Sequence, residues 1–240
     1  MKIESSLIVN GKRVDGRKPE EIREVRMKVG LIENANGSAM VSFGKTTALA
    51  AVYGPREIYP KHLQDPEKGI LRVRYMMLPF SVDERKSPGM DRRSIELSKI
   101  IRTALEPAIF LEEFPRVGID IFVDILQADG STRVTSINAS SLALASAGVP
   151  MKDLVCACSI GKVDNVLVLD INGIEDNNCQ ADLSFAMMPG KDKITLIQMD
   201  GLMSKEELMK AIELGRKTCL KIYEMQKDAL RRKYEEVAKE

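Results

Sequence analysis

The sequence predicts an α+β protein made of two similar halves, at about residues 20–115 and 116–240, within a single domain that spans residues 1–240. In each half, apolar residues first alternate with a period of two, which is typical of strands, and then recur every three or four residues, which is typical of a helix. No linker-like stretch interrupts the chain, and 240 residues with 44% hydrophobic content provide ample material for a buried core.

The first half begins with strands, because its apolar residues alternate and glycines separate the runs. Pro115 follows the helix that ends this half, and a proline cannot continue a helix. The predicted elements are, in order, a β-meander at 24–53, an exposed polar loop at 59–69, a strand at 71–78 and a helix at 94–113.

The second half repeats this order. Gly148 and Pro150 provide the stop signal of an Ala-rich helix, and Ser204 with Glu207 forms a capping box at the start of a long charged helix. The predicted elements are a strand at 117–125, a helix at 135–148, strands at 155–160, 166–170, 182–188 and 194–199, and a helix from about 204 to near the C-terminus.

Composition excludes several classes of function. The 36 basic and 35 acidic residues leave a net charge of +1, which argues against coating nucleic acid by bulk positive charge but is compatible with a local basic channel. The only histidine is His62, so a second His for a zinc or iron site is absent, as is a Ser-His-Asp triad elsewhere. Acid–base chemistry therefore falls mainly to carboxylates.

The chain is expected to be a cytoplasmic protein with no membrane partner. It contains no run of about 18 apolar residues, and its first residues lack the apolar segment of a signal peptide. The four cysteines form no C-x-x-C pair, and Cys156 and Cys158 alternate on a predicted strand. We therefore expect reduced cysteines that pack in the core.

The stretch 37–46 ends in Gly44-Lys45-Thr46 and resembles a phosphate-binding P-loop. A P-loop needs a glycine where this chain has Ala39, and it must lead into a helix. Here strands are predicted on both sides, so we interpret Gly44-Lys45 as a turn of a hairpin.

A second glycine-containing stretch, 128–133, lies between a strong strand and the Ala-rich helix. Gly130 allows the backbone to approach an anion, and the free N–H groups at the start of the helix favour a phosphate. Arg133 can bind the same anion with its planar guanidinium group. The alternative is an ordinary Asp-Gly turn followed by a Ser/Thr helix cap.

Arg92 and Arg93 precede the helix predicted from Ser94. Two positive charges in a first helical turn oppose the helix dipole, at a cost of roughly 0.3–1 kcal/mol each. Such exceptions to local rules are expected at functional sites, although a solvated run of charges is the alternative.

Asp176 and Asp182 form the candidate catalytic pair. In an extended chain they would lie about 20 Å apart, but Asn177-Asn178 favours a turn that brings both carboxylates into one site. Two converging carboxylates suit Mg²⁺ or a general acid with a raised pKa. A solvated Asp-rich loop is the alternative.

Together, these features resemble the RNase PH family of phosphate-dependent 3′-exoribonucleases, over nearly the whole chain. The stretch 13–23 is similar to the R-x-D-G-R-x-x-x-E-x-R pattern of the exosome branch of this family. The stretch 127–133 is similar to the phosphate loop of the family, and 155–159 and 186–189 resemble archaeal exosome members.

The resemblance implies two halves of the ribosomal-protein-S5-domain-2-like kind. It also implies a hexameric ring, a trimer of heterodimers with an inactive RNase PH-like sister subunit, and a cap of S1/KH or zinc-ribbon proteins. The reaction would be phosphorolysis at the 3′ end of single-stranded RNA, with inorganic phosphate as co-substrate. It would release nucleoside diphosphates and could run in reverse to add RNA tails.

The resemblance also implies roles for individual residues. Asp182 is favoured as the acid that protonates the departing 3′-oxygen, and Ser184 stands where bacterial polynucleotide phosphorylase has a lysine. The phosphate would be held by Gly130, Ser131, Thr132, Arg133 and Arg93, and the RNA by Arg92, Arg93, Lys61 and His62. As the alternative to supplying the acid, Asp176 and Asp182 would bind Mg²⁺.

Two alternative functions share parts of this pattern. A homohexameric RNase PH that trims tRNA would have the same active residues, but the extension before Arg13 and the Cys-Ala-Cys-Ser stretch argue against it. A non-catalytic RNA-binding scaffold subunit would lack the acidic pair and the complete phosphate loop, and this chain has both.

Overall fold

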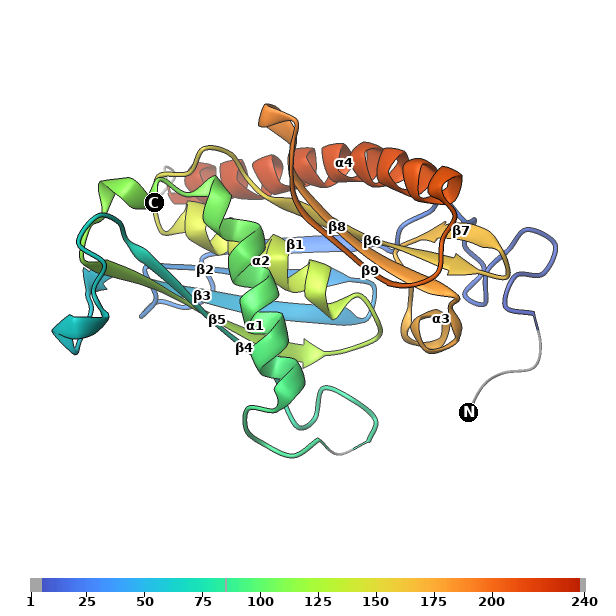
Figure 1. The fold of residues 1–240 in the computed structure, drawn as a ribbon, viewed down its shortest axis with the longest axis horizontal. Coiled ribbons are helices and arrows are strands. Elements are labelled where there is room, and N and C mark those ends of the chain that lie inside the picture. The colour runs from blue at the N-terminus through green and yellow to red at the C-terminus, as the bar shows by residue number, and fades with distance from the viewer. Residues whose placement is uncertain (1–5, 85, 238–240) are drawn as a thin grey trace.

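The computed structural model describes residues 6–84 and 86–237, and its strands form two sheets (Figure 1). The strand order is β1-β2-β3-β5-β4 in the first sheet and β7-β6-β8-β9 in the second. The first sheet contains β1 (Val25–Val29), β2 (Gly37–Phe43), β3 (Thr46–Glu57), β4 (Ile70–Met77) and β5 (Val117–Gln127). The second contains β6 (Cys156–Val163), β7 (Val166–Leu169), β8 (Ala181–Met188) and β9 (Lys193–Gly201).

Helix α2 (Thr132–Ser146) lies between the two sheets (Figure 1). Its small Ala and Ser side chains allow close packing, and nearly the whole helix is buried. Gly37 on β2 shows how close the approach is, since a Cβ atom there would lie 2.3 Å from the carbonyl oxygen of Ala143. The central helix can therefore pack only against a backbone without a side chain at this point.

Strand β6 packs on both faces. Its Ala157 and Ser159 face α2, whereas Cys156 and Cys158 face the long helix α4 (Lys205–Val237). Because both faces are covered, the strand is buried almost throughout rather than on alternate residues. Cys156, Cys158 and Cys219 are free and buried, so the expectation that the strand cysteines pack in the core is confirmed.

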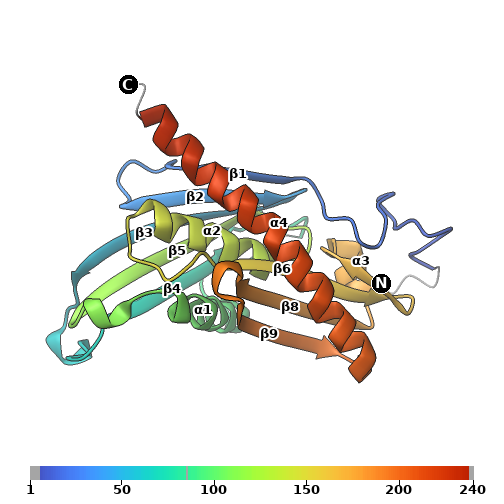
Figure 2. The same ribbon diagram turned by 90° about the horizontal axis from the view of Figure 1, so that it is seen from above.

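Helix α4 crosses the second sheet diagonally, and its C-terminal part reaches β1 (Figure 2). The predicted capping box is present at its start: the Glu207 N–H donates to Ser204 Oγ at 3.2 Å, and the Ser204 N–H donates to the Glu207 carboxylate at 2.8 Å.

Two helices differ from the prediction at their ends. Helix α1 (Arg92–Leu105) ends well before 113, because Pro107 cannot continue it, and two short 3₁₀ turns follow at 106–108 and 111–113. Helix α2 begins at Thr132 rather than 135, directly after Ser131, whose backbone is left-handed.

The boundary between the two sheets also lies later in the chain than the expected 115/116. Strand β5 pairs with β3 and β4, so the alternation at 117–125 completes the first sheet rather than opening the second. The second sheet starts at β6, after α2.

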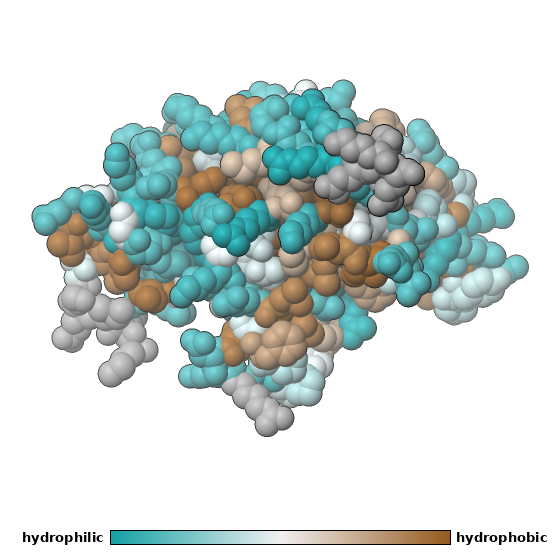
Figure 3. Space-filling view, turned by 180° about the vertical axis from the view of Figure 1, so that it is seen from behind, coloured by the Kyte–Doolittle hydropathy of each residue, from teal (hydrophilic) through white to brown (hydrophobic). Residues whose placement is uncertain are grey.

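The surface seen from behind is mostly hydrophilic, with separate hydrophobic patches in its middle and at its lower edge (Figure 3). Within residues 6–84 and 86–237, no helix is both long and apolar enough to cross a membrane.

Candidate active site

Two adjoining clefts open between the start of α1, the short helix α3 (Gly173–Asn178), the turn before α2, and strands β8 and β9. Their volumes are about 860 and 750 Å³, and Arg93, Asp176 and Asn177 line both. The clefts contain all but one of the residues predicted to bind phosphate or to act in catalysis. These are Arg93, Gly130, Thr132, Arg133, Asp176 and Asp182, and Arg92 also lines the larger cleft.

Arg92 and Arg93 are the first two residues of α1, and both are exposed on the cleft. The preceding Asp91 offsets their unfavourable position at the helix start, because its carboxylate accepts hydrogen bonds from the Ser94 N–H at 2.7 Å and the Ser94 hydroxyl at 2.6 Å. These bonds, together with Lys86 at 3.1 Å, hold the pKa of Asp91 well below its usual range. The arginine side chains are therefore left available to a ligand.

The predicted phosphate turn does not form an ordinary helix cap. Gly130 has a φ of +71°, and a Cβ atom there would lie 2.6 Å from the backbone of Asn172, so only glycine fits. Ser131 precedes α2, but its hydroxyl contacts Ser159 Oγ at 2.6 Å and donates to the Ile171 carbonyl at 2.8 Å. The Ser131 side chain does not cap α2, so among the described residues the first N–H groups of this helix have neither a helical partner nor an N-cap bond.

This arrangement divides the roles expected of the turn. The side chain of Ser131 faces away from the clefts and fixes the turn to β6 and to the segment before α3. The backbone N–H groups at the start of α2, rather than the Ser131 hydroxyl, are the donors available to an anion.

Arg133 lies between the phosphate turn and the acidic residues. Its Nη1 donates to Ser184 Oγ at 2.8 Å and lies 3.9 Å from the Asp182 carboxylate. Its Nε is buried and has no hydrogen-bond partner in the part of the chain that the structure describes. The side chain as a whole is partly exposed on the cleft, and such a guanidinium group is suited to binding an anion.

Asp176 and Asp182 lie in the same cleft, but a different local structure from the predicted turn brings them together. Asn177 and Asn178 belong to the six-residue helix α3, which an Asn172–Glu175 capping box begins. This helix reverses the chain before Asp182 at the start of β8. The predicted convergence of the two acids is therefore present, whereas the prediction of a turn at Asn177-Asn178 was wrong.

The environment of the acids raises their pKa values. Burial raises the pKa of Asp182 to about 6, with further contributions from the neighbouring carboxylates of Asp176 and Asp200, against the lowering effect of Arg133 and Arg93. Burial also raises the pKa of Asp176. A carboxyl group with a pKa near 6 retains a proton in a useful fraction of molecules near neutral pH, as a general acid requires.

The two acids also fit a magnesium ion. The Asp182 Oδ1 atom is buried and has no hydrogen-bond partner among the described residues, which leaves it free as a ligand. Over that same part of the chain, no group of three His, Cys, Asp or Glu side chains is arranged to hold a metal. A pair of carboxylates suits Mg²⁺, which commonly binds through one or two carboxylates, waters and substrate phosphates.

Lys61 and His62 lie far from this site. They form an exposed 3₁₀ turn between β3 and β4, at the opposite end of the first sheet from α3 (Figure 1). Strand β5 spans the distance with 11 residues, or roughly 35 Å.

Two cleft residues on β9 were missed by the sequence analysis. Asp200 pairs with Asp182 across β8 and β9, and Gln198 pairs with Ser184. The Gln198 Oε1 atom is buried without a hydrogen-bond partner among the described residues. The antiparallel register of the two predicted strands would have placed Asp200 opposite Asp182, but the predicted strand stopped at 199.

The comparisons with known proteins agree with this geometry. Residues 21–150 match domain 1 of the 3′ exoribonuclease family (RNase_PH), and residues 153–218 match domain 2 (RNase_PH_C). The chain belongs to the RNase PH family. The predicted α+β class and RNase PH fold are thereby confirmed.

Two sequence relatives and one solved structure are similar to this chain over most of its length. The chain is 58% identical over 231 residues to the exosome complex component Rrp41 of Pyrococcus furiosus. This match covers 96% of this chain and 92% of the relative. Rrp41 of Thermococcus kodakarensis is also 58% identical over 231 residues, with 96% and 93% coverage. The crystal structure of rice (Oryza sativa) Rrp46 has a TM-score of 0.80 at 25% identity and covers 90% of this chain and 98% of that one.

In this RNase PH protein, the N-terminal arginine motif at 13–23 is structural. The Arg13 guanidinium group binds the Glu175 carboxylate in α3 through Nε, at 2.7 Å, and through Nη2, and both side chains are buried. Arg23 donates to both carboxylate oxygens of Asp170, and Arg17 donates to the Asp170 carbonyl at 3.1 Å. The motif therefore fixes the segment that leads into α3 and its Asp176.

We predict that Asp182→Asn abolishes turnover without weakening the fold. Removal of a general acid lowers the rate by about 10²–10⁴-fold. Because the pKa of Asp182 is higher in the folded chain than in the unfolded chain, wild-type stability falls as the pH rises from about 4 to 6. The variant lacks this loss, so its free energy of unfolding relative to wild type should rise between pH 4 and pH 7.5.

The gain should be at most about 3 kcal/mol, from about two pKa units at 1.36 kcal/mol each. Single-turnover decay of bound RNA and urea unfolding at the two pH values measure the two effects. Asp228→Asn on the exposed side of α4 is the control. Near-wild-type decay in Asp182→Asn would remove this residue from the mechanism.

Proposed function

We propose that the chain is a phosphate-dependent 3′-to-5′ exoribonuclease that releases nucleoside diphosphates by phosphorolysis. The observation that carries this proposal is the placement of an uncapped helix N-terminus and two arginines in the same clefts as a carboxyl group that retains its proton near pH 6. The first two features suit an anionic nucleophile, and the third suits protonation of a leaving oxygen.

The proposed reaction proceeds by direct displacement. Inorganic phosphate, held by the N–H groups at the start of α2 and by Arg133 and Arg93, attacks the phosphorus of the last phosphodiester. A new P–O–P bond forms, the bond from phosphorus to the 3′-oxygen breaks, and Asp182 gives its proton to that oxygen. The products are a nucleoside diphosphate and an RNA that is one nucleotide shorter. An excess of nucleoside diphosphate drives the reverse reaction, which extends the RNA and releases inorganic phosphate.

Asp176 would hold Mg²⁺, with Asp182 as a second ligand only in its ionised form, and the ion would neutralise phosphate charge when it is bound. Arg92, together with Arg93, would bind the RNA backbone near its 3′ end. Backbone contacts carry little sequence information, so the enzyme should degrade RNA with little sequence preference.

We place this activity in a hexameric exosome ring that contains three copies of an inactive RNase PH-like sister subunit and is capped by S1/KH or zinc-ribbon proteins. The relatives named exosome complex components support this assembly. The edge strand β9 also supports a partner, since it exposes Ile194, Ile197 and Met199, and an apolar edge strand is normally covered. The buried free cysteines fit the reducing cytoplasm.

Within such a ring, Lys61 and His62 would contact RNA far from its 3′ end. The separation of roughly 35 Å along β5 corresponds to about ten nucleotides at a stacked spacing of about 3.4 Å.

The products of the reaction test the main proposal. With labelled RNA and phosphate, the assembled protein should release nucleoside 5′-diphosphates, and the rate should depend on the phosphate concentration. Equal rates in phosphate-free buffer, with nucleoside monophosphates as products, would show hydrolysis instead.

Arg133 and the α1 arginines should fail at different steps. Arg133→Ala should mainly raise the KM for phosphate, because its guanidinium group serves the small anion. The double change of Arg92 and Arg93 to Ala should weaken RNA binding and reduce its salt dependence. Phosphate titration and RNA binding over a salt series measure both, and Arg102→Ala, at the exposed end of α1, is the control. Identical effects of the two changes would contradict the division of roles.

The double change of Lys61 and His62 to Ala should affect only long RNA. It should weaken binding of an RNA of about 20 nucleotides and leave one of about 4 nucleotides unchanged, because the short RNA cannot span the distance. Lys28→Ala, on the far edge strand β1, controls for loss of a surface charge. An equal loss for both RNA lengths would rule out a remote contact.

A further inference from the structure

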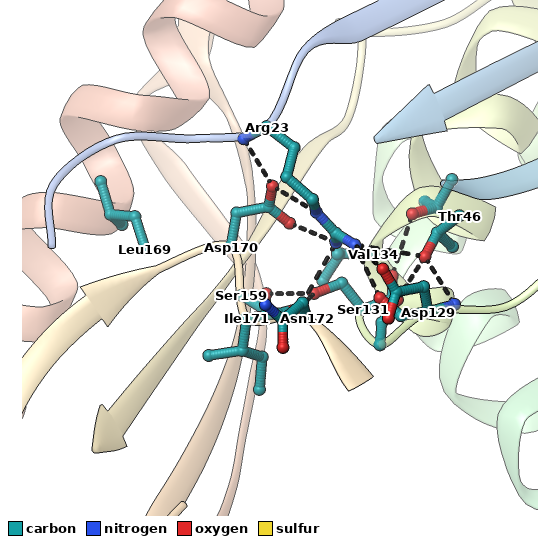
Figure 4. A network of polar contacts seen from close by, with 12 residues as sticks. Arg23, Thr46, Asp129, Ser131, Val134, Ser159, Leu169, Asp170, Ile171 and Asn172 are labelled. Carbon is teal, nitrogen blue, oxygen red and sulfur yellow. Dashed lines mark hydrogen bonds and ion pairs between the residues drawn. The ribbon is translucent and has the colours of Figure 1, made fainter. Parts of the chain in front are cut away.

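Gly44-Lys45-Thr46 joins the paired strands β2 and β3 and opens no helix. The prediction that it is a hairpin turn and not a P-loop is therefore confirmed. Tertiary folding nevertheless places Thr46 against the phosphate turn, more than 80 residues later in the chain (Figure 4). Its side chain does not line either cleft.

The Thr46 hydroxyl both accepts a hydrogen bond from the backbone of the phosphate turn and donates one to it. The Asp129 N–H donates to Thr46 Oγ1 at 3.0 Å, and Thr46 Oγ1 donates to the Gly130 carbonyl at 2.8 Å. Thr46 itself is fully buried. A buried hydroxyl that serves as acceptor and donor at once has a fixed orientation, so it fixes the two backbone groups relative to each other.

Arg23 holds the same turn from the adjacent side (Figure 4). Its Nη1 donates to the Asp129 carbonyl at 2.6 Å, while Nε and Nη2 bind Asp170 at 2.9 and 2.6 Å. The stem of Arg23 packs on Gly44, where a Cβ atom would lie 2.7 Å from Arg23 Cδ. The β2–β3 turn therefore supports the phosphate turn both directly and through Arg23.

These contacts occupy several of the polar groups that precede α2. The Asp129 N–H, the Asp129 carbonyl and the Gly130 carbonyl all have partners, and the Ser131 hydroxyl is bound to Ser159. The N–H groups at the start of α2, which receive no bond from the Ser131 side chain, are available to an anion. Gly130 is the flexible residue of the turn, so external contacts must fix its orientation.

We propose that Thr46, supported by Arg23, is a positioning residue for phosphate: it orients the Asp129–Gly130 backbone so that the N–H groups of α2 point at the anion. This inference rests on the proposed phosphorolytic function. A donor set oriented before binding loses less entropy when the phosphate arrives, so the effect should be on phosphate affinity rather than on RNA binding.

Replacement of Thr46 by Val and by Ser tests the proposal in the full chain, assembled as the active complex. Thr46→Val removes both of these hydrogen bonds, and the one that Arg23 Nη1 donates to Thr46 Oγ1 at 3.4 Å, at nearly constant volume. It should raise the KM for phosphate by about tenfold. Turnover at saturating phosphate and the Kd for RNA should remain within about twofold of wild type. Thr46→Ser keeps the hydroxyl and should restore most of the phosphate affinity.

The neighbouring Thr47→Val is the matched control. Thr47 lies on the same hairpin and its hydroxyl contacts Ser42 at 3.0 Å, away from the phosphate turn. It should behave as wild type. An unchanged KM for phosphate in Thr46→Val, an equal defect in Thr46→Ser, or a matching loss of RNA binding would overturn the proposal.

Arg23→Lys covers the case in which Thr46→Val does not fold. Lysine keeps the charge beside Asp170 but cannot also reach the Asp129 carbonyl with a second donor, so the KM for phosphate should again rise and the Kd for RNA should not. An unchanged KM would overturn the proposal. If wild type itself shows no phosphate dependence, the phosphorolytic function fails; if wild type depends on phosphate and Thr46→Val matches Thr47→Val, only the role of Thr46 fails.

Discussion

The buried pairing of Arg13 with Glu175 is the interaction on which the acidic side of the site depends. Both side chains are almost completely inaccessible to solvent. A buried charge is costly unless it is paired, and removal of one partner from such a pair typically costs about 3–5 kcal/mol. The pair joins segments 162 residues apart in sequence, so α3 can take its place only when the N-terminal segment has docked. The geometry of the clefts is therefore a property of the whole fold.

Much of the fold could be predicted because its signals are local. The strict alternation at 117–125 and the stop signal at Gly148 identify β5 and the end of α2, and the Ser204–Glu207 capping box marks the start of α4. The residues of the phosphate turn were identified in the same way, because Gly130 and Arg133 stand at a strand-to-helix transition that needs no long-range information.

What could not be predicted depends on contacts between distant segments. Helix α3 is too short to show a periodic pattern, and Asp200 enters the cleft only through the register of β8 and β9. Lys61 was given an RNA-binding role by the family resemblance, but β5 places it at the opposite end of the sheet from the acidic residues. Thr46 was set aside with the false P-loop, because nothing nearby in the sequence shows that its hydroxyl meets Asp129 and Gly130.

The site also has an energetic cost that the N-terminal segment offsets. Asp182 and Asp200 lie directly opposite each other on neighbouring strands, where like charges are destabilising, and Asp182 is largely buried as well. A six-residue helix is not stable by itself, so α3 cannot hold Asp176 beside these charges without help. Arg13 supplies that help through Glu175, whereas Arg23 of the same motif contacts the phosphate turn through Asp129. One N-terminal motif thus stabilises both sides of the cleft by different contacts, the acidic side through α3 and the opposite side through the turn before α2.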